Sequence, residues 1–292
     1  MTRLVLALMW VVHFLPLQLL GGLGQTLGML LYAFGWERRQ VVHINLRLCF
    51  PALDRGARTA LARRHFRALG RSFLERGLLW WAARDRIERL VRVEGDEHWL
   101  AVAGRPVIFL APHFVGFEMG GVRIQLEQAV VSIYSRQKHA QFDAALLRGR
   151  MRFAKARLYS RQDGVRPIVR ALRAGLPLYY LPDMDFGARD AIFAPFFGVP
   201  VATVSALARM AAIAGAAVVP CVTRQLPRGE GYIVRFYPAW EQFPGADLGA
   251  DVRRMNAFIE ERVREMPEQY YWVHKRFKTR PEGETSPYER EA

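Results

Sequence analysis

The N-terminal segment constrains this chain more than any other part of it. From Leu4 to Trp36 the sequence reads "LVLALMWVVHFLPLQLLGGLGQTLGMLLYAFGW", with no Asp, Glu, Lys or Arg before Glu37. A helix of about 20 apolar residues is long enough to cross the hydrocarbon core of a bilayer. The run is too long for a signal peptide, and no small-residue cleavage site precedes the charged "ERRQ". We therefore predict a membrane anchor over residues 1–36, either a spanning helix or a bent hairpin in one leaflet; the alternative is a pair of buried core helices.

Basic residues flank this anchor mainly on its carboxyl side. Arg38, Arg39 and Arg47 follow it closely, whereas only Arg3 and the amino terminus precede it. Positively charged flanks favour the cytoplasmic side of a membrane. We therefore expect the domain that follows the anchor, residues 37–292, to face the cytoplasm.

The charge balance indicates acidic partners. The chain carries 42 Lys and Arg against 27 Asp and Glu, a net charge of +15. This excess is larger than solubility requires, and it suits nucleic acid, anionic lipid head groups or an acidic carrier protein. Most of the positive charge comes from arginine, whose planar guanidinium binds phosphate and carboxylate in bidentate fashion.

From about residue 91 the hydropathy pattern alternates between short apolar strands and helices. Such strands are typical of a parallel sheet that is covered on both faces. The pattern predicts an α/β fold with a mostly parallel central sheet flanked by helices, following one or two amphipathic helices over 54–83. The charged end, 280–292, is expected to be loose. The predicted strands are 106–111, 129–134, 176–182, 216–223 and 232–238, and the predicted helices are 119–128, 139–156, 164–174, 203–214 and 247–266.

Several common catalytic and metal-binding motifs are absent from the sequence. There is no GxSxG, no P-loop, no HExxH, and no GxGxxG after a strand. The two cysteines, Cys49 and Cys221, have apolar neighbours and no CxxC spacing, so we expect two buried thiols in reduced form. The sequence thus predicts neither a metal site nor a cofactor.

A histidine and a glutamate follow the first predicted strand of the sheet, in "LAPHFVGFEMGG" (110–121). Pro112 ends the strand, so His113 lies in the strand-to-helix turn, where open α/β sheets bind ligands. If the whole stretch were helical, His113 and Glu118 would point about 140° apart, so they meet only if His113 lies in the loop. In that case Glu118 fixes the tautomer of His113, which takes a proton from a hydroxyl. A structural or merely exposed histidine is the alternative.

The absence of a serine or cysteine nucleophile simplifies the chemistry that this pair predicts. The base activates an acceptor hydroxyl, which attacks an acyl donor directly. This hypothesis depends on His113 being free to accept a proton.

The order of further motifs resembles one protein family. H-x4-(D/E) after a strand is the signature of the glycerolipid and lysophospholipid acyltransferase superfamily, and its neighbours resemble the late acyltransferases of lipid A biosynthesis in Gram-negative bacteria. The resemblance covers nearly the whole chain, including the apolar N-terminal segment. The shared stretches are "INLRLCFP" (44–51), "LRGRMRF" (147–153), "LPDMDFG" (181–187), "FAPFFGVP" (193–200) and "PEQYYWVHKRFKTRPEGE" (267–284).

The resemblance implies an inner-membrane enzyme with two lipid-like substrates. It implies an acyl carrier protein as the acyl donor and an anionic lipid A precursor of the Kdo2-lipid IVA type as the acceptor. By likeness, His113 is the general base, Glu118 is its partner, and Arg150 binds phosphate or stabilises charge in the transition state. A surface arginine is the alternative for Arg150.

The resemblance also suggests substrate-binding residues. Asp183 and Asp185 follow a predicted strand, and we expect them to orient the substrate or to support the structure, because the chemistry needs no metal. Arg276, Lys278 and Arg280 belong to a basic cluster that would bind the anionic lipid or the acidic carrier, with a solvated charged tail as the alternative.

Two other functions remain open on the sequence. A related acyltransferase would act on another membrane lipid, such as a glycolipid or an ornithine lipid. A non-catalytic basic protein would bind membranes or nucleic acid, but it leaves the ordered motifs unexplained, so we expect no nucleic-acid partner.

Overall fold

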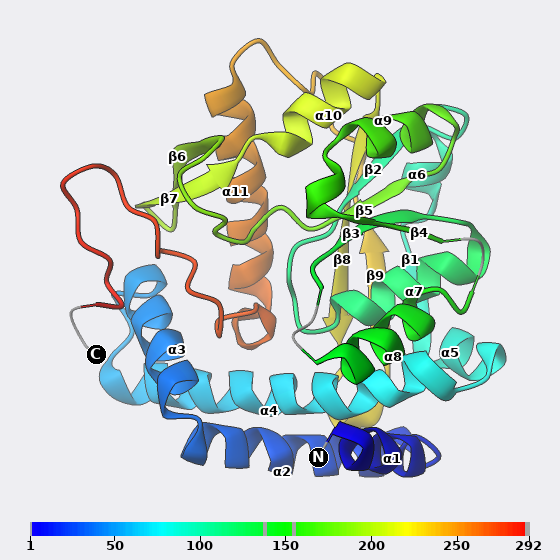
Figure 1. Ribbon diagram of the computed structural model, residues 1–292. Helices are drawn as coiled ribbons and strands as arrows, with labels where there is room; N and C mark the ends of the chain where they lie inside the picture. The colour runs from blue at the N-terminus through cyan, green and yellow to red at the C-terminus, as the bar shows by residue number, and fades with distance from the viewer. Residues whose placement is uncertain (1, 137–138, 154–155, 290–292) are drawn as a thin grey trace.

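The computed structural model describes residues 2–136, 139–153 and 156–289 and has an α/β architecture around a central sheet (Figure 1). Neighbouring strands in the seven-stranded sheet are parallel, except for the antiparallel pair β8–β9. The predicted fold class is therefore confirmed. In spatial order the strands are β1 (Val91–Glu94), β9 (Tyr232–Phe236), β8 (Ala217–Gln225), β2 (Val107–Leu110), β5 (Leu178–Tyr180), β3 (Val131–Tyr134) and β4 (Arg157–Ser160).

Helices cover both faces of the sheet, as the continuous apolar strands predict. Alternate residues of β2 belong to two different apolar clusters: Ile108 and Leu110 face one, and Val107 and Phe109 face the other. The first cluster includes residues of α3, α9, α10 and α11, and the second includes residues of α1, α5 and α7. These helices are α1 (Thr2–Val12), α3 (Trp36–Cys49), α5 (Arg84–Leu90), α7 (Phe117–Glu127), α9 (Arg166–Arg173), α10 (Ala206–Ala214) and α11 (Leu248–Glu265).

The parallel pairing of β2 with β5 positions the loops that follow them. Ile108 lies opposite Leu178, and the pairing continues past the strands as the Ala111 N–H donates to the Tyr180 carbonyl at 2.8 Å. The two chains therefore leave the sheet side by side at its carboxyl edge. Any polar residue directly after one strand lies close to its counterpart after the other.

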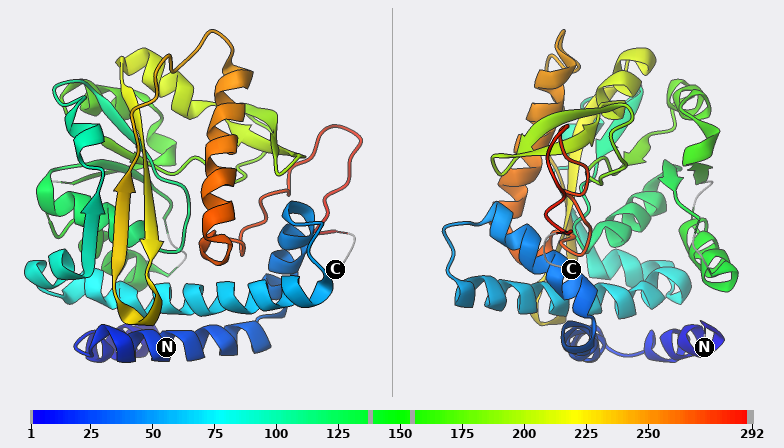
Figure 2. Two further views of the ribbon diagram at one scale, coloured as in Figure 1. Left: turned by 180° about the vertical axis from the view of Figure 1, so that it is seen from behind. Right: turned by 60° about the vertical axis from the view of Figure 1, so that its left-hand side comes forward.

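The N-terminal helices form a layer beside the sheet domain. Helix α2 (Leu17–Phe34) runs along α4 (Arg55–Trp81), and α1 lies against the far end of α4 (Figures 1 and 2). Glycine is required where the two long helices meet, because a Cβ on Gly28 would lie 2.0 Å from the Phe66 carbonyl oxygen and one on Gly70 would lie 2.2 Å from that of Gly24. Within the described residues, α2 alone is long and apolar enough to cross a membrane, by length and composition.

Some elements differ from the sequence prediction. The patterns of β1 and β4 are too polar to be recognised alone, and two prolines obscure the hairpin β6 (Ala191–Phe196)–β7 (Val199–Val204). The helix predicted over 139–156 is α8 (Ala140–Arg150); the predicted residues 154 and 155 lie outside the described ones. The remaining helical segments are α6 (Glu97–Leu100), η1 (Arg161–Asp163), η2 (Pro227–Gly229) and η3 (Pro267–Gln269).

The charged end of the chain is not loose over 280–289, contrary to prediction. Tyr288 is buried, its hydroxyl accepts a hydrogen bond from the Phe277 N–H at 3.1 Å, and it donates to the Asn45 side chain. A single aromatic residue thus attaches the charged segment to α3.

Candidate active site

The loop after β2 carries His113 and is held from two sides. On one side, the Ser72 hydroxyl of α4 donates to the Val115 carbonyl at 2.6 Å. On the other, the Val115 N–H donates to the Gln269 carbonyl at 2.8 Å, and the Tyr271 N–H donates to the His113 carbonyl at 2.9 Å. His113 therefore lies in a fixed strand-to-helix turn, as the sequence predicts.

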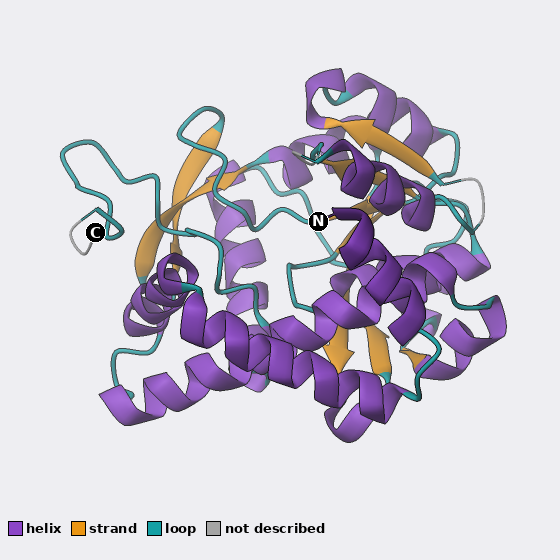
Figure 3. Cartoon of the chain, turned by 60° about the horizontal axis from the view of Figure 1, so that its bottom comes forward, coloured by secondary structure: helices purple, strands orange, loops and turns teal. Residues whose placement is uncertain are grey.

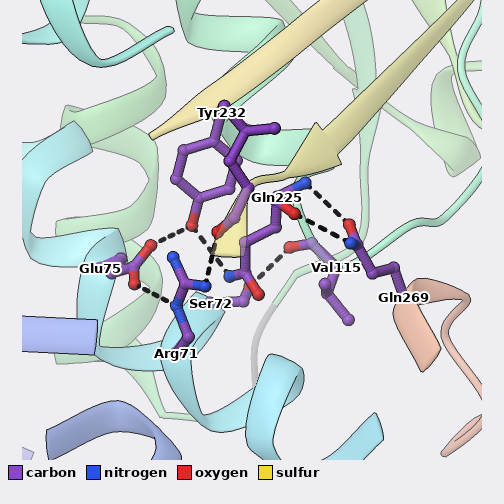
Figure 4. A network of polar contacts seen from close by, with 8 residues as sticks. Arg71, Ser72, Glu75, Val115, Gln225, Tyr232 and Gln269 are labelled. Atoms are coloured by element: carbon purple, nitrogen blue, oxygen red, sulfur yellow. Dashed lines mark hydrogen bonds and ion pairs between the residues drawn. The ribbon is translucent and has the colours of Figure 1, made fainter. Parts of the chain in front are cut away.

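A buried polar network lies next to this loop and supports it (Figure 4). Glu75, which has no exposed surface, accepts from Arg71 Nε at 2.9 Å and from the Tyr232 hydroxyl. Gln225 donates to the Tyr232 hydroxyl at 3.1 Å and also exchanges two backbone–side-chain hydrogen bonds with Gln269. The network connects α4, β8 and β9 to the segment that holds His113. Sequence patterns gave no sign of it, because its members are spread over nearly 200 residues of chain.

The ring of His113 contacts Asp183. Nδ1 lies 2.7 Å from Asp183 Oδ1, and the His113 backbone N–H donates to both carboxylate oxygens, at 3.0 and 3.2 Å. Asp183 follows β5 and His113 follows β2, so the parallel pairing of these strands brings the two residues together. A carboxylate on Nδ1 stabilises the tautomer in which Nε2 is unprotonated and free to accept a proton.

Asp183 is ionised in this position. Burial alone would raise the pKa of Asp183, but its interactions with the ring and backbone N–H of His113 bring that pKa below the ordinary value. Burial and the nearby Asp183 carboxylate together raise the pKa of the Tyr270 hydroxyl well above its usual range.

Glu118 contacts two arginines, and this corrects the role predicted for it. Its Oε1 lies 2.8 Å from Arg150 Nη2 and 3.4 Å from Arg76 Nη2. Burial favours the neutral acid, but Arg150, Arg76 and His113 outweigh it, so the pKa of Glu118 is lowered. The sequence assigned to Glu118 the contact that fixes the tautomer of His113, but in the structure it is Asp183 that contacts the ring. The reason lies in the direction of the side chains in the first turn of α7. The Phe117 ring packs against the His113 ring, with centroids 5.3 Å apart, whereas Glu118 extends toward α4 and α8.

Arg150 lies beside Glu118 at the cavity, and its catalytic role stays a prediction, whereas Arg76 was missed. Arg76 belongs to the long amphipathic helix α4, in which arginines recur on the solvated face, so its position carried no distinguishing signal. The signal for the Asp183 contact was present: both residues directly follow buried strands, which in a parallel sheet end at one edge.

Asp185 has a structural environment. One oxygen accepts from the Thr279 N–H at 2.7 Å, and the other accepts from the Thr279 hydroxyl at 2.7 Å and from the Gly187 N–H at 2.9 Å. The Asp185 N–H donates to His274 Nε2 at 2.8 Å, in keeping with a pKa of His274 that burial and Arg276 lower to about 4. Of the two roles that the sequence left open, the geometry supports the structural one, and the substrate contact predicted for Asp185 is corrected accordingly.

The predicted basic cluster does not form one surface. Arg276 is only 2% exposed, and it donates to the Ala202 carbonyl at 2.9 Å and to the Thr203 hydroxyl at 2.8 Å. Arg280 pairs with Glu284 at 2.6 Å, while Lys278 is exposed. The prediction that Arg276 binds a head group is therefore wrong, because β7 supplies its partners inside the protein.

A cavity of about 820 Å³ opens beside His113. Its polar wall includes His113, Glu118 and Arg150, and it extends past the carboxyl ends of β3, β4 and β5. Its lining also includes two exposed arginines, Arg189 and Arg209. Its volume and largely apolar lining suit a small-molecule or acyl-chain site. The apolar lining residues include Val122, Val130, Ile133, Leu158, Ile168, Met210 and Ile213.

Comparisons with known proteins identify the family of this chain. The family model for bacterial lipid A biosynthesis acyltransferases matches residues 1–279. The lipid A biosynthesis lauroyltransferase of Escherichia coli (strain K12) is 33% identical over 99% of this chain and 94% of its own length. The palmitoleoyltransferase of the same strain is 32% identical over 97% and 92%, and the myristoyltransferase is 30% identical over 93% and 84%. This chain therefore belongs to the bacterial lipid A biosynthesis acyltransferase family.

Proposed function

We propose that this acyltransferase moves a fatty acyl chain from the thioester of an acidic acyl carrier protein to a hydroxyl of an anionic lipid A precursor of the Kdo2-lipid IVA type. The observation that carries the proposal is the His113–Asp183 contact at 2.7 Å at the wall of a largely apolar cavity. No cofactor takes part in this mechanism.

His113 acts as the general base in the proposed reaction. Asp183 keeps the proton on Nδ1, so Nε2 takes the proton of the acceptor hydroxyl as its oxygen attacks the thioester carbonyl carbon. The new C–O bond forms, the C–S bond breaks, and the leaving thiolate takes the proton back from His113. The products are an ester and a free thiol.

The two carboxylates near His113 have different tasks in this mechanism. Asp183 orients the ring through a direct hydrogen bond. Glu118 stabilises the imidazolium at longer range, and its own charge is maintained by Arg150 and Arg76. Arg150 and Glu118 also line the cavity, so they lie where the reacting groups would meet.

The substrates account for the basic surface and the apolar segment. An acidic carrier and a phosphorylated, acidic lipid are both attracted by a net charge of +15. The lipid acceptor lies in a membrane, which the exposed apolar side chains of α1 and α2 would contact. We therefore place the protein at the inner membrane with its catalytic domain in the cytoplasm, where the carrier is found.

The test is acyl transfer by membranes containing the full chain, with acyl-carrier thioesters as donors and the lipid precursor as acceptor. His113→Ala and Asp183→Asn are each expected to lower the rate by about 100- to 10,000-fold. Asp96→Asn, at an exposed position away from the cavity, is the matched control. Full activity of both site variants would overturn the mechanism, and product masses that show another acylated lipid would overturn the acceptor.

A further inference from the structure

The exposed apolar side chains gather on the N-terminal helices. Most of the large apolar residues that are exposed in the described chain lie between Leu4 and Trp36. They include Leu8, Phe14, Leu19, Leu23, Leu30 and Phe34, each between 48% and 83% exposed. A patch of this kind on a folded protein marks a surface that another apolar phase covers. Figure 3 brings this side forward and shows that α1, which starts at the marked N-terminus, and α2 lie across the front of the molecule.

Helix α2 presents two different faces. Its buried face consists of Leu17, Leu20 and three glycines, and it is pressed against α4. The opposite face carries the exposed leucines, and the one hydroxyl there, on Thr26, donates to the Gly22 carbonyl of the same helix at 3.1 Å. The Thr26 hydroxyl is therefore hydrogen-bonded within the helix and needs no water, which suits an apolar environment.

The rest of the protein contacts α2 along its length. At its start, a Cβ on Gly229 of η2 would lie 2.7 Å from the Gln18 Cα. In the middle, Gly24 meets Gly70, and near the end the Tyr32 ring packs on Phe66 with centroids 5.4 Å apart.

The turn between α1 and α2 is held as well. Arg86 of α5 donates to the carbonyls of His13 and Leu15, at 2.6 Å each. The helix is thus attached sideways to the domain, and it does not project from it.

This attachment argues against α2 crossing a bilayer. If α2 stood upright, α4 would stand beside it, and its exposed residues Arg63, Arg64 and Arg67 would lie at the depth of Gly28 inside the membrane. Charged side chains facing hydrocarbon are costly and rare. If α2 lies flat, α4 runs parallel to the surface about 8–10 Å further out, and the three arginines reach the head groups.

We infer that α1 and α2 lie in the plane of one leaflet of an anionic bilayer, with their exposed face in the boundary between head groups and acyl chains. Arg39 lies over the rings of Trp36 and Tyr32, at 4.9 and 5.4 Å, and Arg63 lies 5.7 Å from the ring of Tyr32. Aromatic and basic side chains together are typical of the interface with anionic lipid. The inference deepens the proposed membrane association and rests on it, but not on the proposed chemistry.

The test is the depth of single spin labels in the full chain, reconstituted into vesicles of phosphatidylethanolamine and phosphatidylglycerol. Leu19→Cys, Thr26→Cys and Phe34→Cys sample the start, middle and end of α2, and the native Cys49 and Cys221 are both buried. We expect equal, shallow depths of about 5–10 Å at all three positions. Leu100→Cys is the control. Leu100 is an apolar residue that is 50% exposed and lies outside α1 and α2, so a label there should be accessible from water.

A second measurement gives the sidedness. With Arg3→Cys and Glu37→Cys, an impermeant maleimide added to sealed vesicles should label both positions from the same side. A middle label deeper than the two end labels, or labelling from opposite sides, would show a spanning helix and overturn the inference. Water accessibility at all three depth positions would overturn it too. Neither measurement reads activity, so inactive protein with flat helices would refute only the proposed reaction.

Discussion

Glu118 keeps its charge in a buried position because two arginines converge on it. Arg76→Gln removes one of them, so we expect the pKa of Glu118 to rise. The ionised form is present above that pKa, and activity that depends on it is lost as the pH falls. The acidic limb of the kcat/KM profile should therefore move to higher pH in Arg76→Gln and return toward the wild-type position in Arg76→Lys. An unchanged acidic limb, with activity lowered equally at every pH, would instead mean that Arg76 has only a structural role.

His65 makes the stability of the fold depend on pH. It is fully buried, its ring Nδ1 hydrogen-bonds the Glu268 carbonyl at 3.0 Å, and burial lowers its pKa from 6.5 to about 4. The unfolded chain binds this proton more readily than the folded one, so stability is fully present above pH 6.5 and falls between pH 6.5 and about 4. The loss is on the order of 3 kcal/mol at the acidic end.

Thermal unfolding over this pH range tests the prediction. His65→Asn retains a donor for the Glu268 carbonyl but does not titrate, so its unfolding temperature should depend less steeply on pH. Equal slopes in the variant and the wild type would contradict the assignment to His65.

At the scale of elements, the contact between α2 and α4 depends on glycine. A Cβ on Gly28 would meet backbone atoms of α4 at 2.0 Å, whereas one on Gly22 would have no neighbour within 4 Å. Gly28→Ala should therefore destabilise the protein by about 1–3 kcal/mol. Gly22→Ala, in the same helix, should be neutral or stabilising by up to about 1 kcal/mol. Unfolding midpoints in one detergent compare the two, and equal midpoints would mean that the helices do not meet at Gly28.

At the scale of the whole molecule, the net charge of +15 should steer an acidic donor toward the protein. We expect kcat/KM with a carrier-protein thioester to fall steeply as salt is added, since screening weakens attraction between exposed charges. A thioester of a small neutral thiol should show a much weaker salt dependence under the same conditions. Equal salt dependence for the two donors would remove the electrostatic argument for an acidic carrier.

The membrane orientation also belongs to this scale. With α1 and α2 flat on the bilayer, the sheet domain stands on one side of the membrane (Figure 2). The exposed Arg63, Arg64 and Arg67 then add to the attraction of the surface for anionic lipid. In this proposed orientation, one layer of helices both supports α4 and contacts the membrane.

The sequence by itself determined those features that depend on neighbouring residues. Hydropathy period identified the apolar segment, most of the strands and the helices between them, because each repeats within a few residues. Pro112 after a buried strand was enough to predict that His113 lies in a turn at the carboxyl edge. β1 and β4 were missed because charged residues, Arg92 and Glu94 in one and Arg157 in the other, interrupt the apolar pattern.

Only the tertiary structure decided which distant residues meet. Strand order brought Asp183 to His113 in place of Glu118. Packing buried Arg276 against β7, although its sequence neighbours suggested a basic surface. The same holds for α2, whose composition allows a span but whose glycines attach it sideways to α4. The physical reason is common to all three: a side chain's partners depend on which elements are adjacent in space, and local sequence does not encode that adjacency.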